Sequence, residues 1–417
     1  MIVCENAEER KEEKAMFGLV IGASEESIFG IHTARKLGMH VLAFDGDKEA
    51  AGLKEADEAY VVDIRKPEEI YAILEEKGVT KENAVVIPVP IGRYLISAGA
   101  VNDHFGLTGI SEKSANLCTD KYAFHKVLFE EGLRNASCCL LPAGTTEIEA
   151  IDGKVVVKPR YGAGSRGVFQ LSGRKEWDRW KRELPFEEDY VIETAIEGQE
   201  YGIDGMVSGG RFQLVLLRKK ILTPPPVRQC VGYFSVPENS ETDVFIHRVE
   251  EYVQKIVSKM GLENCILHGD LLLEETGNLF MIELSARPSG HRLHDKFTPL
   301  VTGVDMIDTY LRFATNGKYD CLEKKTEGMY LIHYFDMEEC EITHLPSDKE
   351  LEAYPLVDYS CSLSLGPVGK VTDGHSIMGR GYFILKGQKE DELLDYSRQI
   401  LELFVSDRGE RSNKNAR

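Results

Sequence analysis

The stretch CILHGDLLLEETGNLFMIELSARPSGHR, residues 265–292, decides the fold. Two apolar runs flank the turn-forming residues EETGN, a pattern typical of a β-hairpin. If the loop covers residues 275–278, Glu274 pairs with Leu279, and counting outward places Asp270 opposite Glu283. Directly opposed side chains share a face of the hairpin, with Cβ atoms about 4.5–5.5 Å apart. The stretch therefore predicts two neighbouring carboxylates on otherwise apolar strands.

The carboxylate pair indicates a metal site. Two ionised carboxylates at this spacing repel each other, which shifts their pKa values or lowers stability. A hard divalent cation removes the repulsion, and Mg²⁺ in proteins is usually held by one or two carboxylates together with phosphate oxygens. Asp270, Glu283 and Ser285 are therefore candidate ligands of Mg²⁺, with Mn²⁺ as the alternative, and Arg287 continues the same face. A pair of solvent-exposed carboxylates, or a salt bridge from Glu283 to an arginine, is the simpler explanation.

A second hairpin is predicted upstream, in VVVKPRYGAGSRGVFQL, residues 155–171. Lys158 precedes the glycines, whereas the lysine of a Walker loop follows them at the start of a helix. Glycines let the main chain reach positive φ and approach a ligand closely. We expect a hairpin whose tip covers phosphate groups, the alternative being a tip that binds nothing. The candidate ligands at this tip are Gly162, Gly164, Ser165, Arg166 and Gly167.

Composition excludes several classes of protein. The chain has 417 residues, 42% hydrophobic and 29% charged, and a net charge of −19. This charge argues against a broad surface for nucleic acid or anionic membranes. No apolar run is long enough to span a bilayer, and the N-terminus is too charged for a signal peptide. The nine cysteines include no CxxC pair, so we expect a reduced protein of the cytoplasm.

The N-terminal part predicts a doubly wound parallel sheet. From Phe17 onward, short apolar strands alternate with helix-length segments. A single helix is expected over residues 113–131, and a last helix over residues 390–404. The turn GASEES, residues 22–27, with Asp45 at the end of the next strand, stands where NAD enzymes have their glycine fingerprint and ribose-binding acid. Only Gly22 matches that fingerprint, so an NAD site is the weaker interpretation.

Taken in order, these features resemble the ATP-grasp ligases, from about Gly18 to the final helix. Lys121 in CTDKYAFHKVL matches the lysine that precedes the family's lid domain, and Lys158 matches the second lysine. The segment VIETAIEGQE resembles the strand that contacts adenine. By this resemblance Asp270 and Glu283 would hold the metal, although glutamate is commoner at the first position and asparagine where Ser285 stands. The remaining nucleotide contacts implied are Glu193, Thr194, Ile196 and the ribose-binding acid Glu200.

The resemblance also implies a fold of several α/β and α+β domains. The expected divisions are a charged leader (1–16), an N-terminal α/β domain (17–118), a linker helix (119–141), a lid domain (142–203), a metal and substrate domain (204–325), a C-terminal α+β domain (326–407) and a disordered tail (408–417).

The implied activity is ATP-dependent joining of a carboxylate to an amine through an acyl phosphate. Lys158 and Arg287 would be catalytic, and Arg287, Lys220, His291 and His294 would contact small-molecule substrates. The C-terminal segment resembles that of amino-acid ligases, which favours an amino acid or small peptide. A homodimer is compatible with the sequence. A bicarbonate-using carboxylating ligase of the biotin carboxylase type and a nucleotide-binding protein without turnover remain alternatives.

Overall fold

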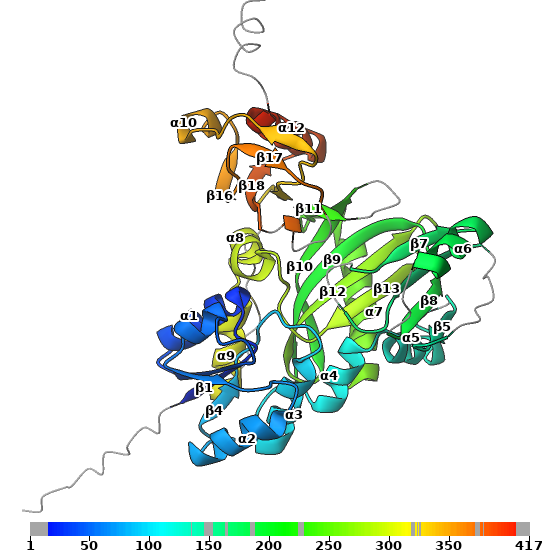
Figure 1. Cartoon of the computed structure of the whole chain (residues 1–417). Coiled ribbons are helices and arrows are strands. Elements are labelled where there is room, and N and C mark those ends of the chain that lie inside the picture. Colours follow the sequence, from blue (N-terminus) through cyan, green and yellow to red (C-terminus); the bar gives the residue numbers. More distant parts are fainter. Residues whose placement is uncertain are drawn as a thin grey trace, which may run out of the picture.

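The computed structural model describes residues 16–134, 136–145, 153–162, 166–183, 188–223, 229–317, 322, 324, 327–371, 376–377 and 379–405. The predicted leader, apart from Met16, and the predicted tail lie outside these residues. The strands within these residues form four sheets: the N-terminal sheet, the lid sheet, the central sheet and a small two-stranded sheet of Cys340–Ile342 with Gly366–Val368 (Figure 1).

The N-terminal domain is a four-stranded parallel sheet in the order β3-β2-β1-β4, which confirms the doubly wound alternation. One set of buried side chains joins the sheet to α1 and α9, and another joins it to α2 and α3. Its elements are β1 (Phe17–Ile21), η1 (Glu25–Ser27), α1 (Ile28–Lys36), β2 (His40–Asp45), η2 (Ala51–Lys54), β3 (Glu58–Val61), α2 (Pro67–Glu76), β4 (Ala84–Val86) and α3 (Leu95–Phe105).

The helix predicted over residues 113–131 is two helices, α4 (Glu112–Thr119) and α5 (Lys121–Glu130). The prediction of one helix was wrong because Asp120 has an extended main chain, with φ −98° and ψ 98°. Its side chain accepts hydrogen bonds from the N–H groups of Tyr122 and Ala123, as an N-cap does. This cap places Lys121 at the first position of α5.

The lid is a four-stranded antiparallel sheet in the order β5-β8-β6-β7. The predicted hairpin is confirmed, since Lys154 pairs with Ser172 and Val157 with Phe169. Trp177 and Trp180 of α6 pack on the apolar face of this sheet. The elements are β5 (Cys138–Leu141), β6 (Lys154–Pro159), β7 (Phe169–Ser172), α6 (Arg174–Glu183) and β8 (Tyr190–Thr194).

The central sheet has eight strands in the order β13-β12-β9-β10-β11-β14-β18-β16, and α7 covers one face of its first half. The strands from the C-terminal segment therefore extend the sheet that carries the hairpin of residues 265–292 (Figure 1). The elements of this half are β9 (Gly198–Ser208), β10 (Arg211–Leu222), β11 (Cys230–Ser235), α7 (Asp243–Met260), β12 (Cys265–Glu274), β13 (Leu279–Ser285), η3 (Leu293–Phe297), α8 (Thr298–Thr302) and α9 (Met306–Asn316).

The C-terminal strands pack against the last helix, α12. The expected domain boundaries stay predictions, and two of them fall inside sheets. Residues 119–141 end in β5 of the lid sheet, and β9 crosses the boundary at residue 203. The elements are β14 (Met329–Tyr334), β15 (Cys340–Ile342), α10 (Asp348–Leu351), β16 (Leu356–Cys361), β17 (Gly366–Val368), β18 (Gly381–Gly387) and α12 (Glu390–Val405).

The register of the β12–β13 hairpin confirms Asp270 opposite Glu283. The pairing expected at its loop was wrong, since Leu279 pairs with Leu273 rather than with Glu274. An irregularity between Asp270 and Leu271 adds one residue to β13 and restores the expected register beyond it. The two carboxylates meet because of this bulge.

Candidate active site

A polar face extends across four adjacent strands of the central sheet. His268 pairs with Asp204 on one side and with Ser285 on the other, while Asp270 lies between Gly202 and Glu283 in the same way. Since side chains alternate along a strand, paired residues and those two positions away share a face. The polar members of this face are Glu283 and Ser285 on β13, His268 and Asp270 on β12, Glu200 and Asp204 on β9, and Arg218 and Lys220 on β10.

Lys220 joins two of the predicted site carboxylates. Its Nζ donates a hydrogen bond to Asp270 and lies 3.6 Å from Oε2 of Glu200. Burial opposes the charged form of Lys220, but Asp270 and Glu200 together raise its pKa. Burial also opposes the charged form of Asp270, yet Lys220 holds the pKa of this carboxyl below its usual value. Both groups are therefore charged at neutral pH.

The carboxylate pair fits a divalent cation. Oδ1 of Asp270 is buried and has no hydrogen-bond partner among the described residues, although such atoms are normally satisfied. Within the same part of the chain, no three His, Cys, Asp or Glu side chains form a group that could hold a metal. A pair of acids with few further ligands suits Mg²⁺, which takes other oxygens from water and phosphate. Asp270 and Glu283 would hold it, and Ser285 lies beside them.

A hollow lies between Glu283 of the carboxylate pair and Gly162 at the start of the lid tip. Lys121, Gly162, Glu283, Ser285 and Arg287 all line it. Lys121 donates from Nζ to the carbonyl of Gly162, 2.7 Å away, which joins α5 to the start of the lid tip. Burial lowers the pKa of Lys121, and the nearby charge of Glu283 opposes this shift. Five residues predicted to bind nucleotide, metal or substrate are thus brought together.

The tip of the lid is described in part. Gly164 and Ser165 lie outside the described residues, while Arg166 and Gly167 are exposed. Gly167 has φ 68°, and a Cβ there would meet the Pro159 ring at 3.0 Å, so this turn favours glycine.

Lys158 lies in a buried cluster at the base of the lid. Its Nζ is 2.5 Å from Oε1 of Glu193, whose Oε2 accepts from Arg134 at 2.6 Å. His125 lies between them, 3.2 Å from Glu193 and 3.3 Å from Lys158. Burial and the positive charges of Lys158 and Arg134 hold the pKa of His125 well below its usual value, so the ring is neutral. Glu193 thus anchors Lys158 at the strand end where the glycine-rich tip begins.

The other residues predicted on the linking strand lie at the end of β8. Thr194 is exposed, and its hydroxyl lies 3.1 Å from that of Ser137. Ile196 packs on a small apolar cluster that includes Leu272 and Phe280. Glu200 follows on β9 and faces Lys220 instead of open solvent.

Arg287 lines the hollow, and His291 follows it in the loop after β13. Arg287 donates from Nη1 to the carbonyl of Pro288 at 2.7 Å. Burial lowers the pKa of His291 to about 4, and the neighbouring His268 and Arg287 add to this shift, so this ring is neutral at pH 7. His291 and Arg292 have φ of 63° and 60°, a conformation that costs a residue with a side chain about 1–2 kcal/mol.

His294 has a different environment. Its Nδ1 lies 2.5 Å from the carbonyl of Ser289, and its ring packs edge-on against Phe29 of α1. These contacts hold the loop after β13 against the N-terminal domain. Contact with substrate remains a prediction for His294.

Sequence reasoning missed a second buried ion pair on the polar face. Arg218 and Asp204 are both fully buried, with Nη2 and Oδ1 3.0 Å apart. Asp204 also accepts from Thr298 at 2.7 Å. Burial opposes its charged form, but Arg218 lowers the pKa of Asp204 to about 2. Charged residues inside the apolar strand FQLVLLRKK signalled this pair, but their partner could be found only from the strand order.

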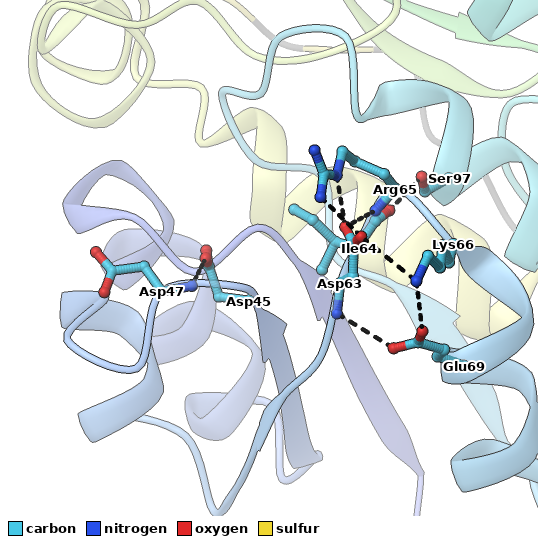
Figure 2. Close-up of polar contacts among 8 residues, drawn as sticks. All are labelled: Asp45, Asp47, Asp63, Ile64, Arg65, Lys66, Glu69 and Ser97. Atoms are coloured by element: carbon cyan, nitrogen blue, oxygen red, sulfur yellow. Dashed lines mark hydrogen bonds and ion pairs between the residues drawn. The ribbon is translucent and has the colours of Figure 1, made fainter.

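The acid expected for an NAD site is used by the protein itself. Oδ2 of Asp45 accepts the N–H of Ala23 at 2.7 Å, and Oδ1 accepts the N–H of Asp47. Figure 2 shows the second contact and, beyond the end of the next strand, the paired hydrogen bonds from Arg65 to Asp63. Both oxygens that would bind ribose are thus engaged by main-chain N–H groups, which argues against the dinucleotide interpretation.

These features define an ATP-grasp fold, and the comparisons agree. The ATP-grasp domain profile matches residues 151–295, which hold the lid lysine, the linking strand and the carboxylate pair. The chain carries an ATP-grasp domain and has the ATP-grasp fold.

Among its relatives, alanine–anticapsin ligase of Bacillus subtilis is 22% identical over 305 residues, which cover 63% of this chain. The match spans 64% of that ligase. The L-amino acid ligase of Bacillus licheniformis superposes with a TM-score of 0.76 at 16% identity, covering 95% of this chain and 100% of that one. The biotin carboxylase domain of a Hydrogenobacter thermophilus 2-oxoglutarate carboxylase, solved with MgADP and bicarbonate, gives 0.64 at 18% identity, covering 93% and 90%.

No helix within the described residues is both long and apolar enough to cross a membrane.

Proposed function

We propose that this protein is an ATP-dependent ligase that joins a carboxylate to an amine, with an amino acid or small peptide as substrate. The observation that carries the proposal is the hollow where Lys121, Glu283, Ser285 and Arg287 meet. The ammonium group of Lys121 on α5, the carboxylate of Glu283 and the guanidinium of Arg287 line one space, and Asp270 pairs with Glu283 across the hairpin. The likeness to two amino-acid ligases supports the choice of substrate.

The first step needs positioning and charge neutralisation. A substrate carboxylate oxygen attacks the γ-phosphorus of ATP, the bond to the bridging oxygen breaks, and ADP leaves. Lys158 and Lys121 would hold phosphate oxygens under the lid, which excludes water once closed. A Mg²⁺ ion held by Asp270 and Glu283 would neutralise phosphate charge. Lys220 keeps Asp270 ionised and so preserves this ligand.

The second step is attack of the amine on the acyl phosphate, with loss of a proton from nitrogen and release of phosphate. Negative charge develops on the carbonyl oxygen as the tetrahedral intermediate forms, and a fixed donor stabilises it. Arg287 would be this donor, since its guanidinium lines the hollow and its Nη1 donates to the carbonyl of Pro288.

The test is ATP turnover with candidate substrates. ADP release should rise when a mixture of amino acids is added without bicarbonate, and hydroxylamine should trap an acyl hydroxamate. Stimulation by bicarbonate alone would favour the second candidate, a carboxylating ligase, which the likeness to the biotin carboxylase domain supports. ADP release with neither would favour a protein that binds nucleotide without this chemistry. Either reaction is compatible with a cytoplasmic enzyme whose cysteines are reduced, and with a monomer as well as a homodimer.

A further inference from the structure

The loop that follows Arg287 has an unusual main chain. His291 and Arg292 both have positive φ, a conformation that glycine adopts more readily than a residue with a side chain. The glycine of this loop, Gly290, directly precedes these two positions and occupies neither of them. Strained main chain persists only where surrounding contacts hold it, and such segments gather at functional sites. Contacts from other parts of the chain must therefore hold this loop in its conformation.

Two distant segments hold the peptide groups on either side of His291. Oε1 of Glu26, from the turn after β1, accepts the N–H of His291 at 2.8 Å. The hydroxyl of Tyr334, on β14, donates to the carbonyl of His291 at 2.6 Å. A Cβ at Gly290 would lie 2.9 Å from Oε1 of Glu26, so the carboxylate needs glycine there.

This loop determines the direction of Arg287. The guanidinium donates to the carbonyl of Pro288, and the chain from Pro288 to His291 is only four residues long. Turning the peptide before His291 out of its strained conformation would displace that carbonyl and release the guanidinium. Arg287 lines the hollow shared with Glu283 and Ser285, so such a change would reach the site.

We propose that Glu26 is a positioning residue: by holding the N–H of His291 it fixes the loop after β13 and thereby aims Arg287 at the substrate. The effect on turnover rests on the proposed ligase function. The effect on the loop does not, since it follows from the contacts of Glu26 alone.

Glu25 is a matched control. It is the neighbouring glutamate, and it also contacts the loop, through an ion pair 2.9 Å from Nη2 of Arg292. Its side chain is 72% exposed, and exposed pairs contribute little. Loss of the carboxylate at this turn is therefore matched between Glu25→Ala and Glu26→Ala, but only the second removes the acceptor of the main-chain hydrogen bond.

The experiment measures hydrogen–deuterium exchange of residues 286–298 and steady-state kinetics in full-length variants. In Glu26→Ala the amides of this segment should exchange at least about ten-fold faster, because the acceptor is gone. With the amino acid that stimulates turnover, kcat should fall about ten-fold as Arg287 is misplaced, while ATP affinity stays within about two-fold. Glu26→Gln should recover most of both, since an amide oxygen still accepts, and Glu25→Ala should match the wild type.

Gly290→Ala tests the same contact from the other side. Its added Cβ would push the Glu26 carboxylate away and should reproduce the faster exchange of Glu26→Ala. Unchanged exchange in both variants, or equal effects at Glu25 and Glu26, would overturn the proposal. Faster exchange with unchanged kcat would overturn the link to Arg287. If exchange becomes faster in both variants but no amino acid stimulates ATP turnover by the wild type, the role of Glu26 in holding the loop stands and the proposed function fails.

Discussion

The site has two ends that can be compared: the lid end, where Lys158 and Glu193 meet, and the substrate end, formed by Arg287 and the loop that follows it. Both ends depend on buried charged groups, but their contacts join residues at different separations along the chain. At the lid end, the contact of Arg134 with Glu193 spans 59 positions. At the substrate end, the contact of Glu26 with His291 spans 265, and it joins the N-terminal domain to the central sheet. The lid end therefore depends on the lid and the neighbouring α5 segment, whereas the substrate end needs the N-terminal domain and the central sheet to keep their relative positions.

The comparison predicts that variants at the lid end change nucleotide binding, while those at the substrate end change chemistry with nucleotide still bound. Glu283 of the carboxylate pair lines the same hollow as Lys121 and Arg287.

The largest effect is expected at that pair. Glu283→Gln should reduce ADP formation by about 10³-fold or more at millimolar Mg²⁺, because a neutral amide cannot balance the cation and phosphate charge. Glu275→Gln, on the exposed loop of the same hairpin, is the control and should keep full activity. Full activity of Glu283→Gln would show that the carboxylate pair is structural. Asp270→Asn should be milder, since the short side chain of Asp270 is expected to reach the cation through a water molecule.

A large effect on stability is expected at the buried ion pair of Asp204 with Arg218. Asp204→Asn should lower the free energy of unfolding at pH 7 by about 3 kcal/mol, because it leaves the buried charge of Arg218 without its partner. The exposed pair of Asp308 with Arg312 offers the control, since Asp308→Asn should cost about 0.5 kcal/mol or less. Urea unfolding of both variants measures the difference.

The same pair gives a pH dependence with a defined sign. The folded pKa of Asp204 is about 2, below its ordinary 3.8, so its contribution to stability is present above pH 3.8 and is lost as pH falls toward 2. The deficit of Asp204→Asn relative to the wild type should therefore shrink between pH 4 and pH 2. A constant deficit over that range would contradict the charged pair.

Arg287→Ala should separate chemistry from binding. Product formation should fall about 100-fold, since a donor to the developing oxyanion is removed. ATP affinity, measured by calorimetry, should change less than about two-fold, because a contact made only with the transition state leaves ground-state binding unaffected. Equal losses of affinity and turnover would mean that Arg287 holds nucleotide instead, and the contrast between the two ends would fail.

The smallest effect is expected within the lid cluster. Arg134 serves three acceptors at once, on Glu193, His125 and the carbonyl of Ala136. Arg134→Lys keeps the positive charge but loses the planar set of guanidinium N–H donors, and should lower the free energy of unfolding by about 2 kcal/mol. Lys154→Met removes the exposed ion pair with Glu197 and is the control, with a cost of less than about 1 kcal/mol. A loss of the same size in both would show that the cluster contributes no more than a surface pair.

The two ends also differ in how far the sequence predicts them. The hairpins were predictable because turn residues and alternating apolar positions lie within one short stretch, as for Asp270 and Glu283. The site neighbours of Lys121 were predicted through the family resemblance. Arg218 and Asp204 meet only because β9 and β10 are adjacent in the sheet, and Glu26 reaches His291 across two domains. Such contacts have no local pattern.

Local reasoning failed at two further points. Asp120 lies within a helical pattern, but its carboxylate caps a new helix. The bulge on β13, opposite Asp270 and Leu271, has no glycine or proline among residues 280–284 to mark it. In each case a polar or irregular position overrides the periodic pattern.

The central claim is that a substrate carboxylate oxygen attacks the γ-phosphorus of ATP. The most direct measurement uses the amino acid that best stimulates turnover, labelled with ¹⁸O in its carboxylate, and analyses the released phosphate by mass spectrometry. We expect one ¹⁸O atom in each phosphate formed, at a yield equal to that of ADP. Phosphate without ¹⁸O, while product is still formed, would contradict an acyl phosphate and the proposed function with it.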